Sequence, residues 1–144
     1  MATVSLGLTF PGTCEQAFML YKSVFGVEFN DFIQYGQDPA TNATTPLQDK
    51  DKIAYVVMKL GDVFITGDDT LESAGTVITP GNNMGINYGP DTKEEADKVF
   101  QVLADGGKVI SPNTMYPWGY CGSLIDRFGV RWNFFVPAPR EKQA

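Results

Sequence analysis

Apolar and polar positions alternate along some segments of the chain and recur with helical spacing along others. In the first half, an alternating segment at residues 4–10 precedes apolar positions spaced as on one face of a helix, at Ala17, Leu20, Tyr21 and Val24. Shorter alternating or apolar segments follow. The pattern predicts a strand, a helix and three more strands, with the strands at residues 4–10, 27–35, 52–60 and 63–67.

Residues that start and stop such elements lie at the expected places. Thr13 and Gln16 have the spacing of a capping box, in which two side chains satisfy free N–H groups at a helix start. Gly26 is typical of a helix end, because glycine readily adopts the left-handed conformation needed there. Gly61 and Asp62 lie between two strand segments and predict a tight hairpin.

The second half repeats this order. A strand segment at residues 83–88 precedes Asp91 and Thr92, which predict a helix start, and Gly106 and Gly107 predict its end. The apolar face of this helix consists of Ala96, Val99, Phe100 and Leu103. Three more strands are predicted at residues 108–110, 119–125 and 130–136, the last two joined by a turn at residues 126–129.

The two halves match position by position at an offset of 79 residues. The matched pairs are Thr13 with Thr92, Glu15 with Glu94, Ala17 with Ala96, Leu20 with Val99, Tyr21 with Phe100 and Val24 with Leu103. Any two amphipathic helices share apolar spacing, but the matched caps, glycine stops and strand numbers favour a duplication. We expect one domain, 1–144, with module 1 at about 1–69, a linker at about 70–82, module 2 at about 83–137 and a tail at 138–144.

Composition and charge exclude several classes of protein. The 144 residues suit a single domain, and no apolar run approaches the roughly 18 to 20 residues that cross a bilayer. A net charge of -6 and no basic cluster argue against nucleic-acid and membrane-surface partners. The N-terminal segment is typical of a strand and not of a secretion signal, which predicts a cytoplasmic protein.

The donors for a metal site are few. Cys14 and Cys121 lie far apart and the chain has no histidine, which argues against zinc and favours reduced, packed thiols. Asp68, Asp69 and Glu72 form the dense acidic group near a strand end, but they lack the spacing of a calcium loop. We expect a solvated turn there and no bound metal.

Four segments together resemble the PhnB-like proteins of the glyoxalase, bleomycin-resistance and extradiol-dioxygenase superfamily, also called vicinal-oxygen-chelate proteins. These segments are LTFPGTCEQAFMLYKSVFGVEF, DKIAYVVMKLGDVFITGDD, NYGPDTKEEADKVFQVLADGGKV and WGYCGSLIDRFGVRWNFF. The resemblance implies an α+β fold in which two tandem βαβββ modules form a curved mixed sheet around a cleft. It also implies a homodimer.

Active members of that superfamily hold a divalent metal through His, Glu or Gln on the first and last strands of each module. The corresponding segments here are SLGLT, VFITG, GINYG and RWNFF. Asn133 stands where the superfamily often has Glu, and Tyr55 where PhnB-like sequences often have His, so no ligand carries over. Some PhnB-like proteins bear a methyltransferase label, but the chain lacks a GxGxxG turn, and we expect no cofactor, S-adenosylmethionine included.

The cleft implied by this fold would be lined by aromatic and amide side chains, which suit a small, partly apolar ligand. The candidates are Tyr55, Val57, Ile86, Asn87, Tyr88, Met115, Trp118, Tyr120, Cys121, Trp132 and Asn133. A register slip of one residue would exchange inward for outward positions, and each aromatic could equally fill the core. Two segments at residues 36–51 and 111–119 are predicted to be loops that could close over the cleft.

Catalysis by side chains alone would need a titrating group, and Cys121 is the candidate on a cleft strand. Its activation would require Arg131 on the adjoining strand, an arginine that could equally pair with Asp126. We favour a packing role for Cys121. The leading hypothesis is a metal-free small-molecule-binding protein; the alternatives are a lyase, isomerase or dioxygenase of the same superfamily, and a dimeric scaffold without ligand.

Overall fold

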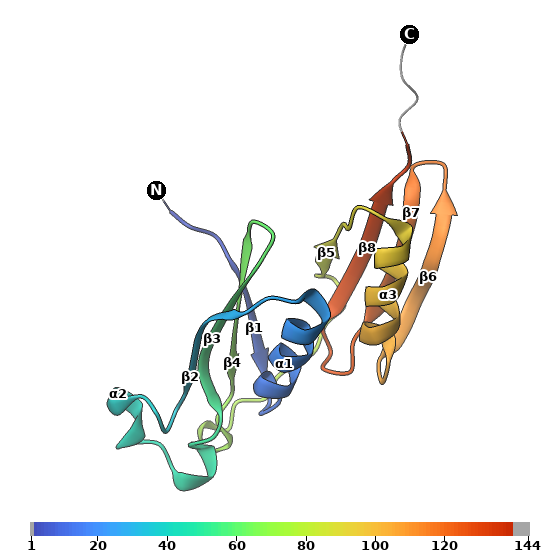
Figure 1. The fold of residues 1–144 in the computed structure, drawn as a ribbon. Coiled ribbons are helices and arrows are strands. Elements are labelled where there is room, and N and C mark those ends of the chain that lie inside the picture. The colour runs from blue at the N-terminus through green and yellow to red at the C-terminus, as the bar shows by residue number, and fades with distance from the viewer. Residues whose placement is uncertain (1, 140–144) are drawn as a thin grey trace. The chain divides into compact units, whose positions relative to one another are not determined.

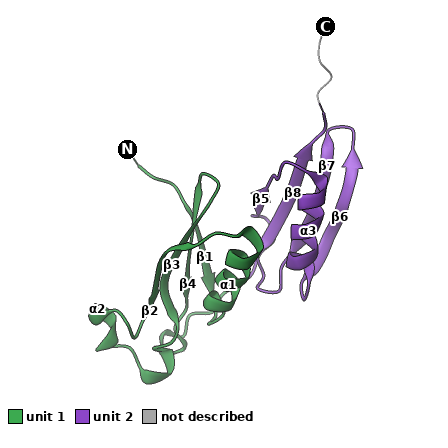
Figure 2. Cartoon of the chain, in the orientation of Figure 1, with its two compact units in different colours: residues 1–79 green, residues 80–144 purple. Residues whose placement is uncertain are grey.

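The order of the strands and of the one long helix is the same in both halves of the chain (Figure 1). The computed structural model describes residues 2–139. The chain divides between Thr79 and Pro80 into two compact units, called unit 1 and unit 2 below (Figure 2). This boundary lies within the linker segment at residues 70–82.

Unit 1 is a four-stranded mixed sheet with a helix packed on one face. The strand order is β1-β4-β3-β2, in which β1 and β4 are parallel and the other pairs are antiparallel. The elements are β1 (Leu6–Phe10), α1 (Cys14–Phe25), β2 (Phe29–Gln34), β3 (Ile53–Leu60) and β4 (Val63–Asp69). Short helices α2 (Pro39–Asn42) and η1 (Leu47–Asp49) lie between β2 and β3, and η2 (Glu72–Ala74) follows β4.

Unit 2 has the same topology. The strand order is β5-β8-β7-β6, and β5 and β8 form the parallel pair. The elements are β5 (Ile86–Tyr88), α3 (Lys93–Ala104), β6 (Lys108–Tyr116), β7 (Gly119–Ile125) and β8 (Arg131–Pro137). The α+β class with two tandem βαβββ modules, predicted from the sequence, is confirmed.

The helices reproduce the offset found in the sequence. Helices α1 and α3 each contain 12 residues and begin at Cys14 and Lys93, which are 79 positions apart. Thr13 and Thr92 are the residues that precede them as N-caps. The Thr92 hydroxyl accepts a hydrogen bond from Glu95 N at 3.2 Å, as the cap pattern predicts.

The capping box predicted at Thr13 is wrong, because its side chain makes no capping hydrogen bond. The carboxylate of Asp69, at the end of β4, takes this role from a distant part of the sequence. Its Oδ1 accepts hydrogen bonds from Cys14 N at 2.9 Å and Gly12 N at 3.1 Å, and its Oδ2 accepts one from Ile53 N at 2.8 Å. Asp69 therefore joins the start of α1 to the start of β3. The solvated turn predicted for Asp69 is wrong, because this residue is only 3% exposed.

The core of unit 1 lies between α1 and its sheet. Phe18 on α1 is fully buried and meets Phe10 edge to face, with ring centroids 6.2 Å apart. Its ring also lies against Gly67 of β4, where a Cβ would collide with Phe18 Cε2 and stand 3.0 Å from Cys14 Sγ. Glycine at position 67 lets the helix approach the sheet closely.

Side chains of a strand alternate between the two faces of its sheet, and each unit covers only one face with its long helix. We call the face that packs against α1 or α3 the helix side and the opposite one the helix-free face. In unit 1 the strand register assigns to the helix-free face Gly7, Thr9, Asp31, Ile33, Tyr55, Val57, Thr66 and Asp68.

The two segments predicted to be loops, residues 36–51 and 111–119, contain more regular structure than expected. Residues 36–51 contain α2 and η1 and are tied down by polar contacts, among them the hydrogen bond from Thr41 Oγ1 to Tyr35 O at 2.8 Å. Asp49 is fully buried there; a hydrogen bond from the Ser73 side chain lowers the pKa of its carboxylate, although burial opposes this.

The loop predicted at residues 111–119 is wrong, because β6 continues to Tyr116 and forms a hairpin with β7. Pro112 and Asn113 hide the strand pattern, because they fall at a register shift of an edge strand, where proline is tolerated. Within residues 2–139, no helix is long and apolar enough to cross a bilayer.

The close approach at Gly67 gives the first testable prediction. Gly67→Ala should lower the free energy of unfolding by about 1–3 kcal/mol, the usual cost of forcing a methyl group into a packed core. Gly7→Ala is the matched control, because a Cβ at Gly7 makes only an ordinary contact, 3.5 Å from Thr66 Oγ1. Urea unfolding of both variants checks this, and equal stability of the two would show that α1 does not pack on β4 as described.

Candidate functional site

The two faces of the sheet in unit 2 have different chemistry. The helix side is the apolar core, in which Leu124, Trp132 and Phe134 are almost completely buried. The alternate strand positions place both polar and apolar side chains on the helix-free face. The strand register assigns to it Asn87, Cys121, Ser123, Ile125, Arg131, Asn133 and Phe135.

A chain of hydrogen bonds crosses this helix-free face from β8 to β5. Arg131 Nε donates to Asn133 Oδ1 at 3.1 Å, and Asn133 Nδ2 donates to Asn87 Oδ1 at 3.0 Å. Arg131 also donates from Nη1 to the Asn82 carbonyl at 2.8 Å, which holds the guanidinium at its other edge. Within residues 80–139, these bonds orient all three side chains and leave further N–H groups of Arg131 and Asn87 available as donors.

Glycine at position 85 makes room for this network. A Cβ on Gly85 would lie 2.8 Å from Asn133 Nδ2, closer than real Cβ contacts, and 3.0 Å from Arg131 Cγ, which is tighter than most of them. The backbone before β5 thus passes directly against the side chains of β8.

A hollow of about 330 Å³ borders the network. It is lined by Pro80, Gly81, Asn82, Ile125 and Gly129. Asn82 belongs both to this hollow and to the hydrogen-bond network, through the bond from Arg131. The volume is at the small end of the range of ligand pockets, roughly 300–1,000 Å³.

The residues that the sequence proposed for the cleft fall on different faces. Asn87, Cys121 and Asn133 lie on the helix-free face of unit 2, and the structure joins the two asparagines directly. Tyr55 and Val57 lie on the helix-free face of unit 1, with Tyr55 exposed and Val57 buried. The binding role of each stays a prediction.

Four proposed strand residues face the helix side instead, which corrects the inward orientation assumed for them. Trp132 is fully buried, and its Nε1 donates to Asp126 Oδ2 at 3.0 Å. Ile86 is its register partner, Tyr88 meets Phe134 edge to face at 5.8 Å, and the Tyr120 hydroxyl bonds to α3. Consecutive strand residues such as Tyr120 and Cys121 point to opposite faces, so the predicted residues cannot all line one cleft.

Met115 and Trp118 lie at the end of the β6–β7 hairpin, where they are 46% and 62% exposed. Trp118 stacks on Tyr116 with ring centroids 5.0 Å apart. These side chains do not join the network on β5 and β8. They form an exposed apolar hairpin end.

Arg131 is the residue that sequence reasoning did not include in the site. The sequence predicts for Arg131 only a role as an activator of Cys121 or as a partner of Asp126. The register pairs Arg131 with Ile125 and Cys121 with Phe135, so the cysteine lies four residues away along β7. Asp126 instead accepts hydrogen bonds from Phe128 N, Val130 N and Trp132 Nε1.

The spacing of Arg131, Asn133 and Phe135 could have revealed this face, because every second residue of a strand points the same way. The apolar residues between them are buried. The bond from Arg131 to Asn82 has no signal in the sequence, since the two residues lie 49 positions apart.

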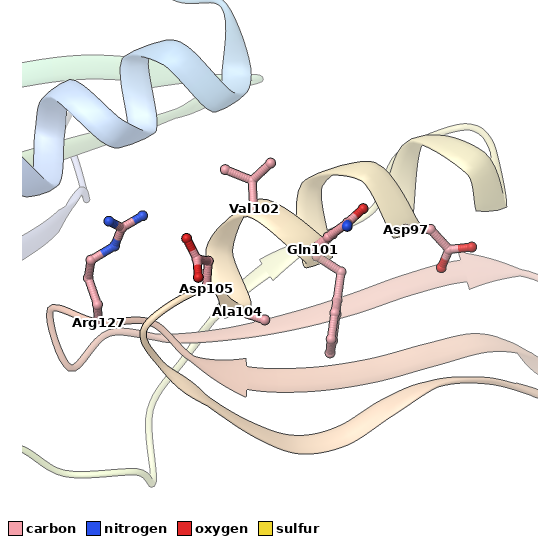
Figure 3. A pocket seen from close by; sticks show the side chains of 7 residues that line it. Asp97, Gln101, Val102, Ala104, Asp105 and Arg127 are labelled. Atoms are coloured by element: carbon pink, nitrogen blue, oxygen red, sulfur yellow. The ribbon is translucent and has the colours of Figure 1, made fainter.

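A larger hollow of about 700 Å³ lies over α3 (Figure 3). It is lined by Asp97, Phe100, Gln101, Val102, Ala104, Asp105 and Arg127. The Asp97 carboxylate is already bound, because Oδ1 accepts the Tyr120 hydroxyl at 2.7 Å and Asn113 Nδ2 at 3.1 Å. This hydrogen bond raises the pKa of Tyr120. Since the polar groups at this end serve to join α3 to β6 and β7, we favour the network on the helix-free face as the functional site.

Solved structures similar to this chain share its fold. No family model matches the sequence, and no curated protein matches it significantly. Protein PA1353 from Pseudomonas aeruginosa is 26% identical, with 94% of this chain and 98% of that one aligned at a TM-score of 0.79. The PhnB protein from Bacillus cereus is 24% identical over 94% of this chain and 99% of its own, with a TM-score of 0.75.

A glyoxalase/bleomycin resistance protein/dioxygenase family enzyme from Burkholderia phytofirmans is 18% identical, covers 93% of this chain and 97% of its own, and has a TM-score of 0.62. The chain has the glyoxalase/bleomycin-resistance fold. The resemblance to PhnB-like and glyoxalase-superfamily proteins predicted from the sequence is confirmed at the level of the fold.

The donor set of this glyoxalase-like chain does not fit the metal site of active superfamily members. On the first and last strands of the modules, the helix-free faces carry Thr9, Asp68, Asn87 and Asn133 among their polar residues. Asp68 is the carboxylate among them and accepts a hydrogen bond from the Thr9 hydroxyl at 2.8 Å. Within residues 2–139, no three His, Cys, Asp or Glu side chains lie together as a metal site requires.

The two cysteines of this glyoxalase-like chain should differ sharply in reactivity. Cys14 is fully buried, and burial, reinforced by the Asp69 carboxylate, raises the pKa of its thiol, so it should react only after unfolding. Cys121 is partly exposed on β7 and should react with Ellman's reagent in the native state. We expect one fast thiol in the wild type and none in Cys121→Ser. A fast thiol that persists in Cys121→Ser would contradict the burial of Cys14.

Proposed function

We propose that this chain is a PhnB-like small-molecule-binding protein that holds its ligand on the helix-free face of unit 2. The observation that carries the proposal is the hydrogen-bond chain of Arg131, Asn133 and Asn87. Hydrogen bonds of 3.0 to 3.1 Å orient these side chains, and among residues 80–139 some N–H groups of Arg131 and Asn87 have no acceptor. Donors held in place before binding reduce the entropy that a ligand interface must otherwise lose.

Apolar surface beside the network supports the same proposal. Phe135 is 43% exposed on the helix-free face, two residues beyond Asn133 on β8. Ile125 lies opposite Arg131 on β7 and lines the hollow of about 330 Å³. Small-molecule sites typically combine apolar walls with a few directed polar groups, and this face offers both.

We propose that binding needs no metal. The position on β8 where superfamily enzymes often have a glutamate is Asn133, and both polar atoms of its amide are engaged with neighbouring side chains. The adjacent guanidinium of Arg131 would repel a cation from this position. A ligand bound here would therefore be oriented by hydrogen bonds from side chains.

We further propose that the protein works in the cytoplasm and as a homodimer. Both Cys14 and Cys121 are free thiols, which suits a reducing compartment. The homodimer rests on the resemblance to the superfamily. Exposed Met115 and Trp118 at the β6–β7 hairpin are compatible with a contact between copies.

A thermal-shift screen of small metabolites, run on protein treated with a chelator, tests the ligand-binding proposal. We expect compounds that raise the unfolding temperature of the wild type and bind about three- to tenfold more weakly to Asn87→Ala, the usual effect of losing one hydrogen bond. Asn30→Ala is the matched control, because Asn30 is an exposed asparagine on β2.

Binding that appears only after Mn²⁺, Ni²⁺, Zn²⁺ or Mg²⁺ is added back would refute the metal-free proposal. Ligands that bind Asn87→Ala as tightly as the wild type would refute the assignment to this face.

A further inference from the structure

Within residues 80–139, Arg131 is a cation held in position without an anionic partner. Its Nε and Nη1 donate to neutral oxygens, the Asn133 amide and the Asn82 carbonyl. Within residues 80–139 it forms no ion pair. Neutral acceptors orient the guanidinium without neutralising its positive charge. Its remaining N–H groups can donate hydrogen bonds to the oxygens of a carboxylate or phosphate.

A second cation lies across the sheet from Arg131. The strand register aligns Lys108 of β6 with Ile125 of β7, and Ile125 with Arg131 of β8. Residues aligned in this way share a face, so the two cations flank Ile125 with their Cα atoms about 10 Å apart, two strand spacings. Lys108 is exposed and likewise forms no ion pair within residues 80–139.

The carboxylates of unit 2 lie elsewhere. Among its described residues they are on or beside α3 or in the turn between β7 and β8, namely Asp91, Glu94, Glu95, Asp97, Asp105 and Asp126. The strand positions of the helix-free face therefore carry positive charge alone, in a protein of net charge -6. Such a local excess of positive charge attracts small anions, and it contrasts with the net negative charge of the whole protein.

We infer that the ligand of this face is a small organic anion whose carboxylate or phosphate-type group binds Arg131, with Lys108 contributing charge from the other side of Ile125. This inference rests on the proposed function and names its ligand class. The apolar side chains of Ile125 and Phe135 and the amide of Asn87 would contact the rest of the molecule. Binding of this kind weakens as salt concentration rises.

Titration of isotope-labelled protein with benzoate, phenylphosphonate and benzamide, followed by NMR at low salt, tests the inference. Benzoate or phenylphosphonate should shift the Arg131 Nε–H resonance, and neutral benzamide should bind at least about tenfold more weakly, because charge-assisted hydrogen bonds are the stronger ones. A response to phenylphosphonate alone assigns a tetrahedral anion, and a response to benzoate alone assigns a carboxylate.

Variants separate the role of Arg131 in binding from a role in folding. Arg131→Gln should weaken anion binding about tenfold or more, and Lys108→Gln should weaken it less. Arg127→Gln is the matched control, because Arg127 is an exposed arginine of the turn between β7 and β8 and lines the hollow over α3. If Arg131→Gln is unstable, Asn133→Asp keeps the bond to Arg131 Nε, supplies a carboxylate in place of the ligand, and should abolish anion binding.

The outcomes distinguish this inference from the proposed function. If benzamide binds as tightly as benzoate, and Arg131→Gln leaves both affinities unchanged, the face binds neutral molecules and the anion inference fails alone. If anion binding survives Arg131→Gln and Asn133→Asp but is lost in Arg127→Gln, the anion site lies over α3 and the inference is overturned. If no anionic probe shifts any resonance at millimolar concentration, the guanidinium serves only to hold Asn82 and the inference also fails.

Discussion

One long helix covers only one face of a four-stranded sheet, and this constraint governs both units. The face beneath α1 or α3 is committed to the core, with residues such as Phe18 and Trp132 completely buried. The opposite face has no helix of its own unit to pack against, so its alternate positions can hold polar side chains. The candidate functional residues of this protein are therefore the strand residues whose side chains point to the helix-free face.

Buried carboxylates position the elements around these faces. Asp69 connects the start of α1, the start of β3 and the end of β4 through hydrogen bonds from Gly12, Cys14 and Ile53. Asp126 closes the β7–β8 turn and accepts the indole N–H of Trp132, which sets the position where β8 begins. Because Arg131 and Asn133 flank that tryptophan on the other parity, its fixed orientation also directs them to the helix-free face.

Local patterns in the sequence predicted most of the fold. The apolar spacing, glycine stops and the offset between Thr13 and Thr92 predicted both helices and the duplication, because these signals depend on neighbouring residues. The sequence does not determine which face of the sheet each strand residue points to. A shift of one residue in strand register exchanges the two faces, and Tyr120 and Cys121 are both plausible on the inward one. The cap from Asp69 and the bond from Arg131 to Asn82 depend on contacts between distant segments, which leave no periodic pattern.

The neighbouring phenylalanines of β8 offer the most direct test of this division into two faces. Phe134 is 2% exposed on the helix side and Phe135 is 43% exposed on the helix-free face. The free energy of unfolding, measured by urea denaturation, should fall by about 3–5 kcal/mol in Phe134→Ala. In Phe135→Ala it should fall by no more than about 1 kcal/mol. Equal losses in the two variants would mean that both faces are buried in a core, and that no face of unit 2 is left to bind a ligand.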